Sequence, residues 1–156
     1  MQSTPRQDLM PGLETGLLDS VRKPGVGALF PQPRIAKDST TCQFDDEFIS
    51  GFLVVLGSAF PERISPETLE LCTKMKAQIV RFTDEASGET DNIPTVRETE
   101  GIVCRWLAKY DSAAAIVRPD HYVFALSSTN DELDRQLREL AAQLIEYQCD
   151  ARNEIR

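Results

Sequence analysis

The sequence feature that most constrains the fold is a run of five apolar residues at positions 52–56, which Gly57 closes. An uninterrupted apolar run of this length, bounded by a turn residue, is typical of a central strand that is buried on both faces. Segments with helical periodicity follow this run and alternate with further short apolar runs. The pattern therefore predicts an α/β domain built around a central sheet.

Length and charge limit what such a domain can do. A domain of about 150 residues buries about 68–70% of the surface of its unfolded chain, so these 156 residues can fold without a disulfide or a metal. The net charge is −8, and a chain this acidic lacks the excess of Lys and Arg that binds phosphates. We therefore expect neither nucleic acid nor a membrane as a partner. The sequence shows no secretory signal, which favours a cytoplasmic protein.

The remaining elements are predicted from caps, turns and apolar spacing. Pro66 follows Ser65 at the first position of a helix, and Thr129-x-x-Glu132 forms a capping box before another. Arg118, Pro119, Asp120 and His121 form a tight turn between two strands. The predicted order is one or two strands within 34–44, a short helix at 45–51, a strand at 52–56, a helix from Ser65, a strand at 78–82, a polar loop at 84–94, a helix from Thr99 or Glu100, strands at 113–117 and 122–126, and a last helix.

Apolar residues at helical spacing predict the buried face of each helix. The predicted core residues are Leu69, Cys72 and Met75 in the first long helix, Val103, Trp106, Leu107 and Tyr110 in the second, and Leu133, Leu137, Leu140 and Leu144 in the last. The order β-α-β-α-β-α-β-β-α fits a thioredoxin-like three-layer sandwich, with another small three-layer α/β sandwich as the alternative.

An extended lead-in precedes this domain. Five of the nine prolines fall within residues 1–33, where Pro and Gly disfavour regular structure. The lead-in also carries large apolar side chains at Leu9, Met10, Leu13, Leu17, Leu18, Val21, Val26, Leu29 and Phe30. We therefore expect residues 9–34 to lie against the domain or a partner. The predicted divisions are a lead-in at 1–33, the thioredoxin-like domain at 34–150 and a tail at 151–156.

Thiol chemistry is not expected. A redox-active thioredoxin fold places its thiolate after the central strand, at the N-terminus of the next helix, where the helix dipole lowers the thiol pKa. Residues 57–63 occupy that position here and contain no cysteine, while Ser58 lacks an identifiable base. No two of the four cysteines, Cys42, Cys72, Cys104 and Cys149, have a C-x-x-C spacing, and we expect them to be small buried residues.

No other catalytic motif is present in the sequence. It has no G-x-G-x-x-G, no phosphate-binding G-x-x-x-x-G-K-[ST] and no H-E-x-x-H, and its single histidine excludes a multi-histidine metal site. We therefore predict no catalytic, cofactor-binding or metal-binding residue in this chain. Arg118, Asp120 and His121 form either a simple solvated turn or a contact with a neighbouring domain.

Two segments carry a family resemblance. Residues 29–34 (Leu-Phe-Pro-Gln-Pro-Arg) resemble the linker that enters the C-terminal domain of FAD-dependent aromatic hydroxylases, the type that includes phenol hydroxylase and 3-(3-hydroxyphenyl)propionate hydroxylase. Val117-Arg118-Pro119-Asp120 followed by Tyr122-Val123 resembles a hairpin of the same domain. The resemblance extends over roughly residues 10–148.

The resemblance implies a thioredoxin-like domain without the cysteine pair. In that family FAD and NAD(P)H belong to the full-length enzyme, and the flavin-binding motifs lie upstream of this domain. The expected function is a redox-inactive domain with a structural or interaction role, whose partner is a flavoprotein monooxygenase body or a second copy. The alternatives are a subunit or fragment required for hydroxylation of a phenolic substrate and, as the weaker one, a thiol-dependent redox protein using Cys72 or Cys104.

Overall fold

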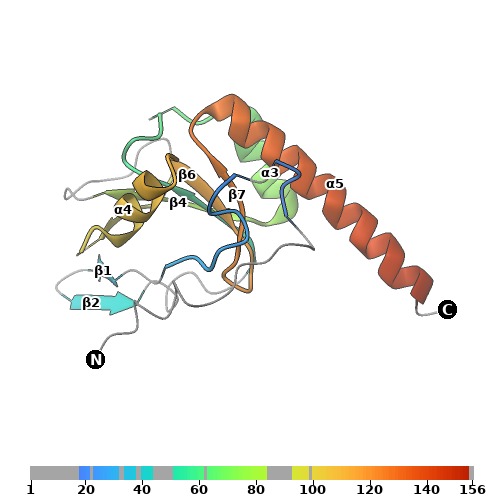
Figure 1. The fold of residues 1–156 in the computed structure, drawn as a ribbon, viewed down its shortest axis with the longest axis horizontal. Coiled ribbons are helices and arrows are strands. Elements are labelled where there is room, and N and C mark those ends of the chain that lie inside the picture. Colours follow the sequence, from blue (N-terminus) through green and yellow to red (C-terminus); the bar gives the residue numbers. More distant parts are fainter. Residues whose placement is uncertain are drawn as a thin grey trace.

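A computed structural model shows a three-layer α/β sandwich around a seven-stranded sheet (Figure 1). It describes residues 18–21, 23–31, 34–37, 40–43, 51–61, 63–83, 93–98 and 100–154, and for 34–37, 40–43 and 146–154 the backbone alone. The strands are β1 (Arg34–Lys37), β2 (Thr40–Gln43), β3 (Leu53–Leu56), β4 (Gln78–Thr83), β5 (Thr95–Glu98), β6 (Ala114–Val117) and β7 (Val123–Ser127).

The sheet order is β2-β1-β5-β4-β3-β6-β7. Strands β3, β4 and β5 are parallel, whereas β6 pairs antiparallel with β3 and β7 antiparallel with β6. All four residues of β3 are buried, because β3 lies in the interior of the sheet with helices on both sides. The prediction from the apolar run at 52–56 is confirmed.

Three helices cover the sheet, namely α3 (Pro66–Met75), α4 (Ile102–Lys109) and α5 (Asn130–Glu154). Helices α3 and α5 pack on one face, where Cys72 joins Leu133, Leu137 and Leu140 in one apolar cluster. Helix α4 packs on the other face, with Val103 and Leu107 fully buried and Trp106 and Tyr110 partly buried (Figure 1). The thioredoxin-like sandwich predicted from the order of elements is confirmed.

Local signals in the sequence set where two of the helices begin. The Ser65 hydroxyl accepts the backbone N–H of Glu67 at 3.2 Å, and Pro66 takes the first helical position of α3. Before α5, the Thr129 hydroxyl accepts the backbone N–H of Glu132 at 3.2 Å. The Glu132 carboxylate accepts the N–H of Ser128 at 2.9 Å, one residue earlier than in a standard capping box.

Three details of the predictions are wrong. Strand β5 is missing from them, because its only apolar residue is Val96 and its place in the sheet comes from pairing with β4 and β1. Helix α4 begins at Ile102, after Gly101 takes a left-handed conformation. Leu69 is exposed, because the buried strip of α3 runs through Thr68, whose hydroxyl donates to the buried Asp134 carboxylate of α5. The predicted helix at 45–51 and most of the loop at 84–94 lie outside the described residues.

Residues 18–21 and 23–31 of the lead-in form a strap along the outer edge of β7. The N–H of Asp19 donates to the Phe124 carbonyl at 3.0 Å, and that of Gly27 donates to the Val123 carbonyl at 2.8 Å. Val123 in turn donates its N–H to the Ala28 carbonyl at 2.8 Å. The strap therefore satisfies backbone groups that an edge strand would otherwise expose.

The strap also supplies core side chains. Phe30 is 4% exposed and meets the Trp106 ring of α4 edge to face, with the ring centroids 5.5 Å apart. Leu18 is 1% exposed at the other end of the strap, and its carbonyl accepts a hydrogen bond from the Gln143 side chain of α5 at 2.8 Å. The expectation that the apolar lead-in lies against the domain is confirmed for these residues, while residues 9–17 lie outside the described part of the chain.

Charged groups fix the strap to α5. The Asp19 carboxylate is buried and accepts two hydrogen bonds from the Arg135 guanidinium, at 3.1 and 3.0 Å. Burial acts to raise the pKa of the Asp19 carboxyl, but the hydrogen bonds and positive charge of Arg135 hold it below its usual value. Lys23 forms an ion pair with Glu132 near the start of α5. Thus Asp19 remains ionised at neutral pH, and the strap is anchored along the helix.

Replacing Gly25 with alanine should destabilise the domain strongly. Gly25 has a φ of +94°, and an added Cβ would lie 2.7 Å from Leu126 Cδ1 and 2.8 Å from Tyr110 Cγ. The strained φ costs about 1–2 kcal/mol and overpacking about 1–3 kcal/mol more, so we expect a loss of about 2–5 kcal/mol in the free energy of unfolding.

Gly101→Ala is the matched control. Gly101 also has a positive φ, +65°, but among the described residues no atom lies within 4 Å of its Cβ position. Its replacement should therefore cost only the conformational part, about 1–2 kcal/mol. Denaturant unfolding of both variants and the wild type measures the difference, and equal losses would contradict tight packing of the strap at Gly25.

Candidate functional site

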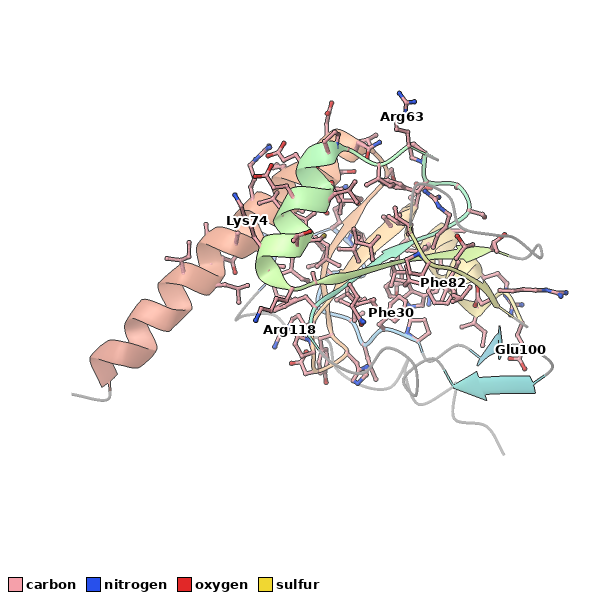
Figure 2. The ribbon with its side chains drawn as sticks, turned by 180° about the vertical axis from the view of Figure 1, so that it is seen from behind. Phe30, Arg63, Lys74, Phe82, Glu100 and Arg118 are labelled. Atoms are coloured by element: carbon pink, nitrogen blue, oxygen red, sulfur yellow. The ribbon has the colours of Figure 1, made fainter. Side chains whose placement is uncertain are left out.

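The parallel strands give the sheet two distinct ends. At one, here called the loop end, β3, β4 and β5 finish and helices α3 and α4 begin. At the other, here called the hairpin end, the turn at 118–122 joins β6 to β7. Figure 2 labels Arg63, which follows β3 on the loop-end side, and Arg118, which follows β6 on the hairpin-end side. A redox-active thioredoxin fold would hold its thiolate at the loop end.

A buried arginine closes the loop after β3. Arg81 of β4 is 8% exposed, and its guanidinium donates to the backbone carbonyls of Gly57 at 3.3 Å, Phe60 at 3.0 Å and Pro61 at 2.8 Å. The Phe60 ring is buried beneath the same loop. The loop at residues 57–61, whose carbonyls accept hydrogen bonds from Arg81, therefore occupies the position at which a redox-active thioredoxin fold holds its thiol.

A buried glutamate closes the start of α4 in a similar way. Glu98 is 4% exposed, and its carboxylate accepts the backbone N–H groups of Val103 and Cys104, the latter at 3.3 Å. The first turn of a helix favours an anion, and here the chain's own carboxylate provides it. Sequence reasoning missed both Arg81 and Glu98. The signal available for Arg81 was a charged residue between the apolar Val80 and Phe82 of a buried strand.

The two cysteines with described side chains are free thiols in different surroundings. Cys72 is 2% exposed, and burial together with the negative charge of Asp134 raises the pKa of its thiol to about 12. Cys104 is partly exposed, with its Sγ 3.8 Å from the Ser58 hydroxyl. Thus the prediction of a buried thiol is confirmed for Cys72 and only in part for Cys104, and the side chains of Cys42 and Cys149 lie outside the described set.

The candidate turn lies at the hairpin end and is ordered by its own polar groups. The Arg118 guanidinium donates to one oxygen of the Asp120 carboxylate at 2.6 Å, and the other oxygen accepts the N–H of Tyr122 at 3.3 Å. His121 adopts a left-handed conformation with φ of 73°. The structure thus brings Arg118 and Asp120 together and turns the chain at His121, but a contact of this turn with another domain stays a prediction.

The two segments that carry the family resemblance meet at this turn. The N–H of Phe30 donates to the His121 carbonyl at 2.7 Å, and Leu29 pairs with Tyr122 as an isolated β-bridge. The segments are far apart in the sequence, so no local pattern predicts their contact. Leu29 and Phe30 of the lead-in are therefore joined to the hairpin in one structural unit.

Across the described part of the chain, no three His, Cys, Asp or Glu side chains gather in a way that could hold a metal ion. Within the same residues, no helix has the length and apolar composition needed to cross a membrane.

Two curated proteins have related sequences. A probable NADH-specific resorcinol 4-hydroxylase from Rhodococcus jostii is 36% identical over 117 residues, which cover 74% of this chain and 22% of the hydroxylase. A 3-(3-hydroxy-phenyl)propionate/3-hydroxycinnamic acid hydroxylase from Klebsiella pneumoniae is 29% identical over 137 residues, covering 82% of this chain and 24% of that protein. The chain thus spans about a quarter or less of the length of these relatives.

Solved structures support the fold. The flavin-dependent monooxygenase PieE aligns with a TM-score of 0.52 at 16% identity, over 86% of this chain and 24% of PieE. The peroxidoxin BcpB from Mycobacterium tuberculosis aligns with a TM-score of 0.54 at 12% identity, over 76% of this chain and 97% of BcpB. A family model described as the HcaD C-terminal domain matches residues 27–143, and the chain therefore belongs to the HcaD C-terminal domain family.

Proposed function

We propose that this chain is the C-terminal domain of an FAD-dependent aromatic-ring monooxygenase, with a structural and docking role and no thiol chemistry of its own. The observation that carries the proposal is the loop after β3, where the buried Arg81 guanidinium binds three backbone carbonyls at the position of a thiol site. The hydroxylase names of the curated relatives supply the enzyme class.

Cofactor binding is assigned to the rest of such an enzyme. The sequence has no glycine-rich turn between a strand and a helix that could hold a dinucleotide pyrophosphate, and the first turn of α4 is already bonded to Glu98. FAD and NAD(P)H would therefore be held by the flavoprotein body, which is the proposed partner, with a second copy of the chain as the alternative. A cytoplasmic location and a contact role for Arg118, Asp120 and His121 stay predictions.

The alternative is that hydroxylation of a phenolic substrate requires this domain as a subunit. The structural role and the required-subunit role predict different behaviour for a flavoprotein body from which this domain has been removed. If the role is structural, such a body keeps its chemistry but loses stability or flavin retention. If the domain is required, the body cannot hydroxylate at all.

A thiol-dependent redox role is the weaker alternative, and the thiol geometry argues against it. Nucleophilic attack on an oxidised substrate requires a thiolate, yet the Cys72 thiol has a pKa raised to about 12 and is 2% exposed. Cys104 is partly exposed, and its backbone N–H donates to the Glu98 carboxylate at 3.3 Å.

A chimeric hydroxylase tests the proposal. Removing the matching C-terminal part of the Rhodococcus jostii hydroxylase should reduce retention of FAD and thermal stability, and fusing this chain in its place should restore both. A chimera with Cys72→Ala and Cys104→Ser should retain flavin and hydroxylate resorcinol within about twofold of the unmutated chimera, because no thiol takes part.

The outcomes separate the alternatives. A truncated enzyme that still holds FAD but no longer hydroxylates supports the required subunit. A folded chimera that loses activity only when Cys104 is replaced supports thiol chemistry and contradicts the proposal. A chimera that does not regain FAD contradicts the assignment of this chain to a hydroxylase.

The Cys72 thiol should make stability depend on alkaline pH. In the unfolded chain it ionises near its ordinary pKa of 9.0, whereas in the folded chain it stays protonated up to about 12. Its contribution is therefore complete below pH 9.0 and is lost as the pH rises toward about 12. At neutral pH, Cys72→Ala should cost about 1–2 kcal/mol. Denaturant unfolding over this range should show the gap between wild type and variant shrinking, and a constant gap would contradict a protonated buried thiol.

A further inference from the structure

The strap meets helix α5 through a polar face of that helix. Four polar residues recur on one side of α5 at i, i+4, i+7 and i+11, namely Glu132, Gln136, Glu139 and Gln143. Each of them is bonded to the strap or to the β7 edge beside it. The leucines of the neighbouring face pack on the sheet. Helix α5 therefore holds the sheet by apolar packing and the strap by hydrogen bonds and charge.

An ion pair lies at the centre of this polar contact. The Asp19 carboxylate is fully buried and accepts two hydrogen bonds from the Arg135 guanidinium, at 3.1 and 3.0 Å. Arg135 also pairs with Glu139 at 3.2 Å, and the Glu139 carboxylate accepts the backbone N–H of Ser20 at 3.1 Å. Loss of the guanidinium would leave Asp19 as a buried charge without its cation, which is costly. Moving this part of the strap into water removes that cost.

The first half of the strap contains little apolar packing. We call residues 18–21 and 23 the entry half. Among its described side chains, Leu18 is the buried apolar one, whereas Val21 is 45% exposed and Lys23 reaches α5 through its charge. Breaking the Asp19–Arg135 pair therefore removes much of what holds the entry half on the helix.

The second half of the strap is held by aromatic packing and backbone hydrogen bonds. We call residues 25–31 the exit half. Phe30 is buried against Trp106, and the Trp106 ring meets that of Tyr110 with centroids 4.9 Å apart. The backbone N–H groups of Gly27 and Phe30 donate to carbonyls of β7 and the hairpin turn. These contacts do not involve the ion pair, so the exit half should stay in place when the pair is broken.

The family model separates the same two halves. It matches residues 27–143, which include most of the exit half and none of the entry half. In an enzyme that carries this domain at its C-terminal end, the polypeptide of the body would reach the domain through the entry half. The entry half would then connect the body with the domain.

We propose that the entry half, fastened to α5 by the Asp19–Arg135 pair, couples this domain to the flavoprotein body and opens separately from the exit half when the pair is broken. The coupling rests on the proposed function, whereas the separate opening is a property of this chain alone. While the entry half is closed, the polypeptide that leads to the body is fixed along α5. When it opens, the same residues become a flexible linker.

Hydrogen exchange of the intact chain tests the separate opening. Arg135→Met breaks the pair, and Arg138→Met is the matched control, because Arg138 pairs with Glu67 of α3 at 2.5 Å and not with the strap. In R135M the amides of Asp19 and Ser20 should exchange at least about 100-fold faster than in the wild type, while those of Gly27 and Phe30 stay within about threefold. In R138M all four should stay within about threefold.

A second variant decides the question if R135M does not fold. Asp19→Asn combined with Arg135→Gln removes both charges and leaves no carboxylate unpaired. It should separate the two pairs of amides in the same direction, by at least about tenfold. Equal acceleration of all four amides in a folded variant, or no acceleration at Asp19 and Ser20, overturns the separate opening.

The chimeric hydroxylase tests the coupling. With the wild-type chain, the body and this domain should unfold in one calorimetric transition that also releases FAD. Arg135→Met should split this transition into two, and Arg138→Met should leave it single. A single transition in the R135M chimera overturns the coupling and leaves the proposed function standing. A chimera that retains no FAD with any of these sequences overturns the coupling together with the proposed function, while exchange in the isolated chain still decides the separate opening.

Discussion

The structure depends on the pairing of the strap with the edge of β7. A strand at the edge of a sheet carries unsatisfied N–H and C=O groups, and here the backbone of Asp19, Gly27 and Ala28 satisfies them. The same segment contributes Phe30 to the cluster beneath α4 and anchors Asp19 on α5. The described part of the lead-in, residues 18–21 and 23–31, therefore packs as part of the domain, and its proline and glycine content suits a segment that must bend around an edge.

The loop end and the hairpin end of the sheet differ in which groups of the chain are bonded there. At the loop end, Arg81 and Glu98 are buried charges whose hydrogen bonds go to the backbone of this same chain. At the hairpin end, the strap both begins, beside Gln143, and finishes, beside His121. The end that serves chemistry in thiol enzymes of this fold is thus occupied by hydrogen bonds within this chain, and the hairpin end is where the strap joins α5 and the turn.

The sequence was sufficient for those parts of the fold that local patterns determine. Apolar runs predicted β3, β6 and β7, and caps at Ser65 and Thr129 predicted the starts of α3 and α5. Strand β5 could not be predicted in this way, because Val96 is its only apolar side chain and its partners lie elsewhere in the chain. The exposed position of Leu69 likewise depends on a tertiary hydrogen bond between Thr68 and Asp134. The candidate site also combines a feature that the sequence predicts with one that it does not. The lack of cysteine in residues 57–63 is evident from the sequence. The guanidinium that binds carbonyls of this loop comes from the neighbouring strand β4, so only the tertiary structure shows it.

The central claim, that the strap is an integral part of the domain, is tested most directly by native-state hydrogen exchange of the intact chain. The informative amides are those of Asp19, Gly27 and Phe30, which donate to carbonyls of β7 and the hairpin, and that of Val123, which donates to the strap. The account predicts that all four exchange with similar opening free energies, close to that of global unfolding. Exchange of the three strap amides within seconds, while the amides that pair β6 with β7 remain protected, would show that the strap opens independently and would contradict the account.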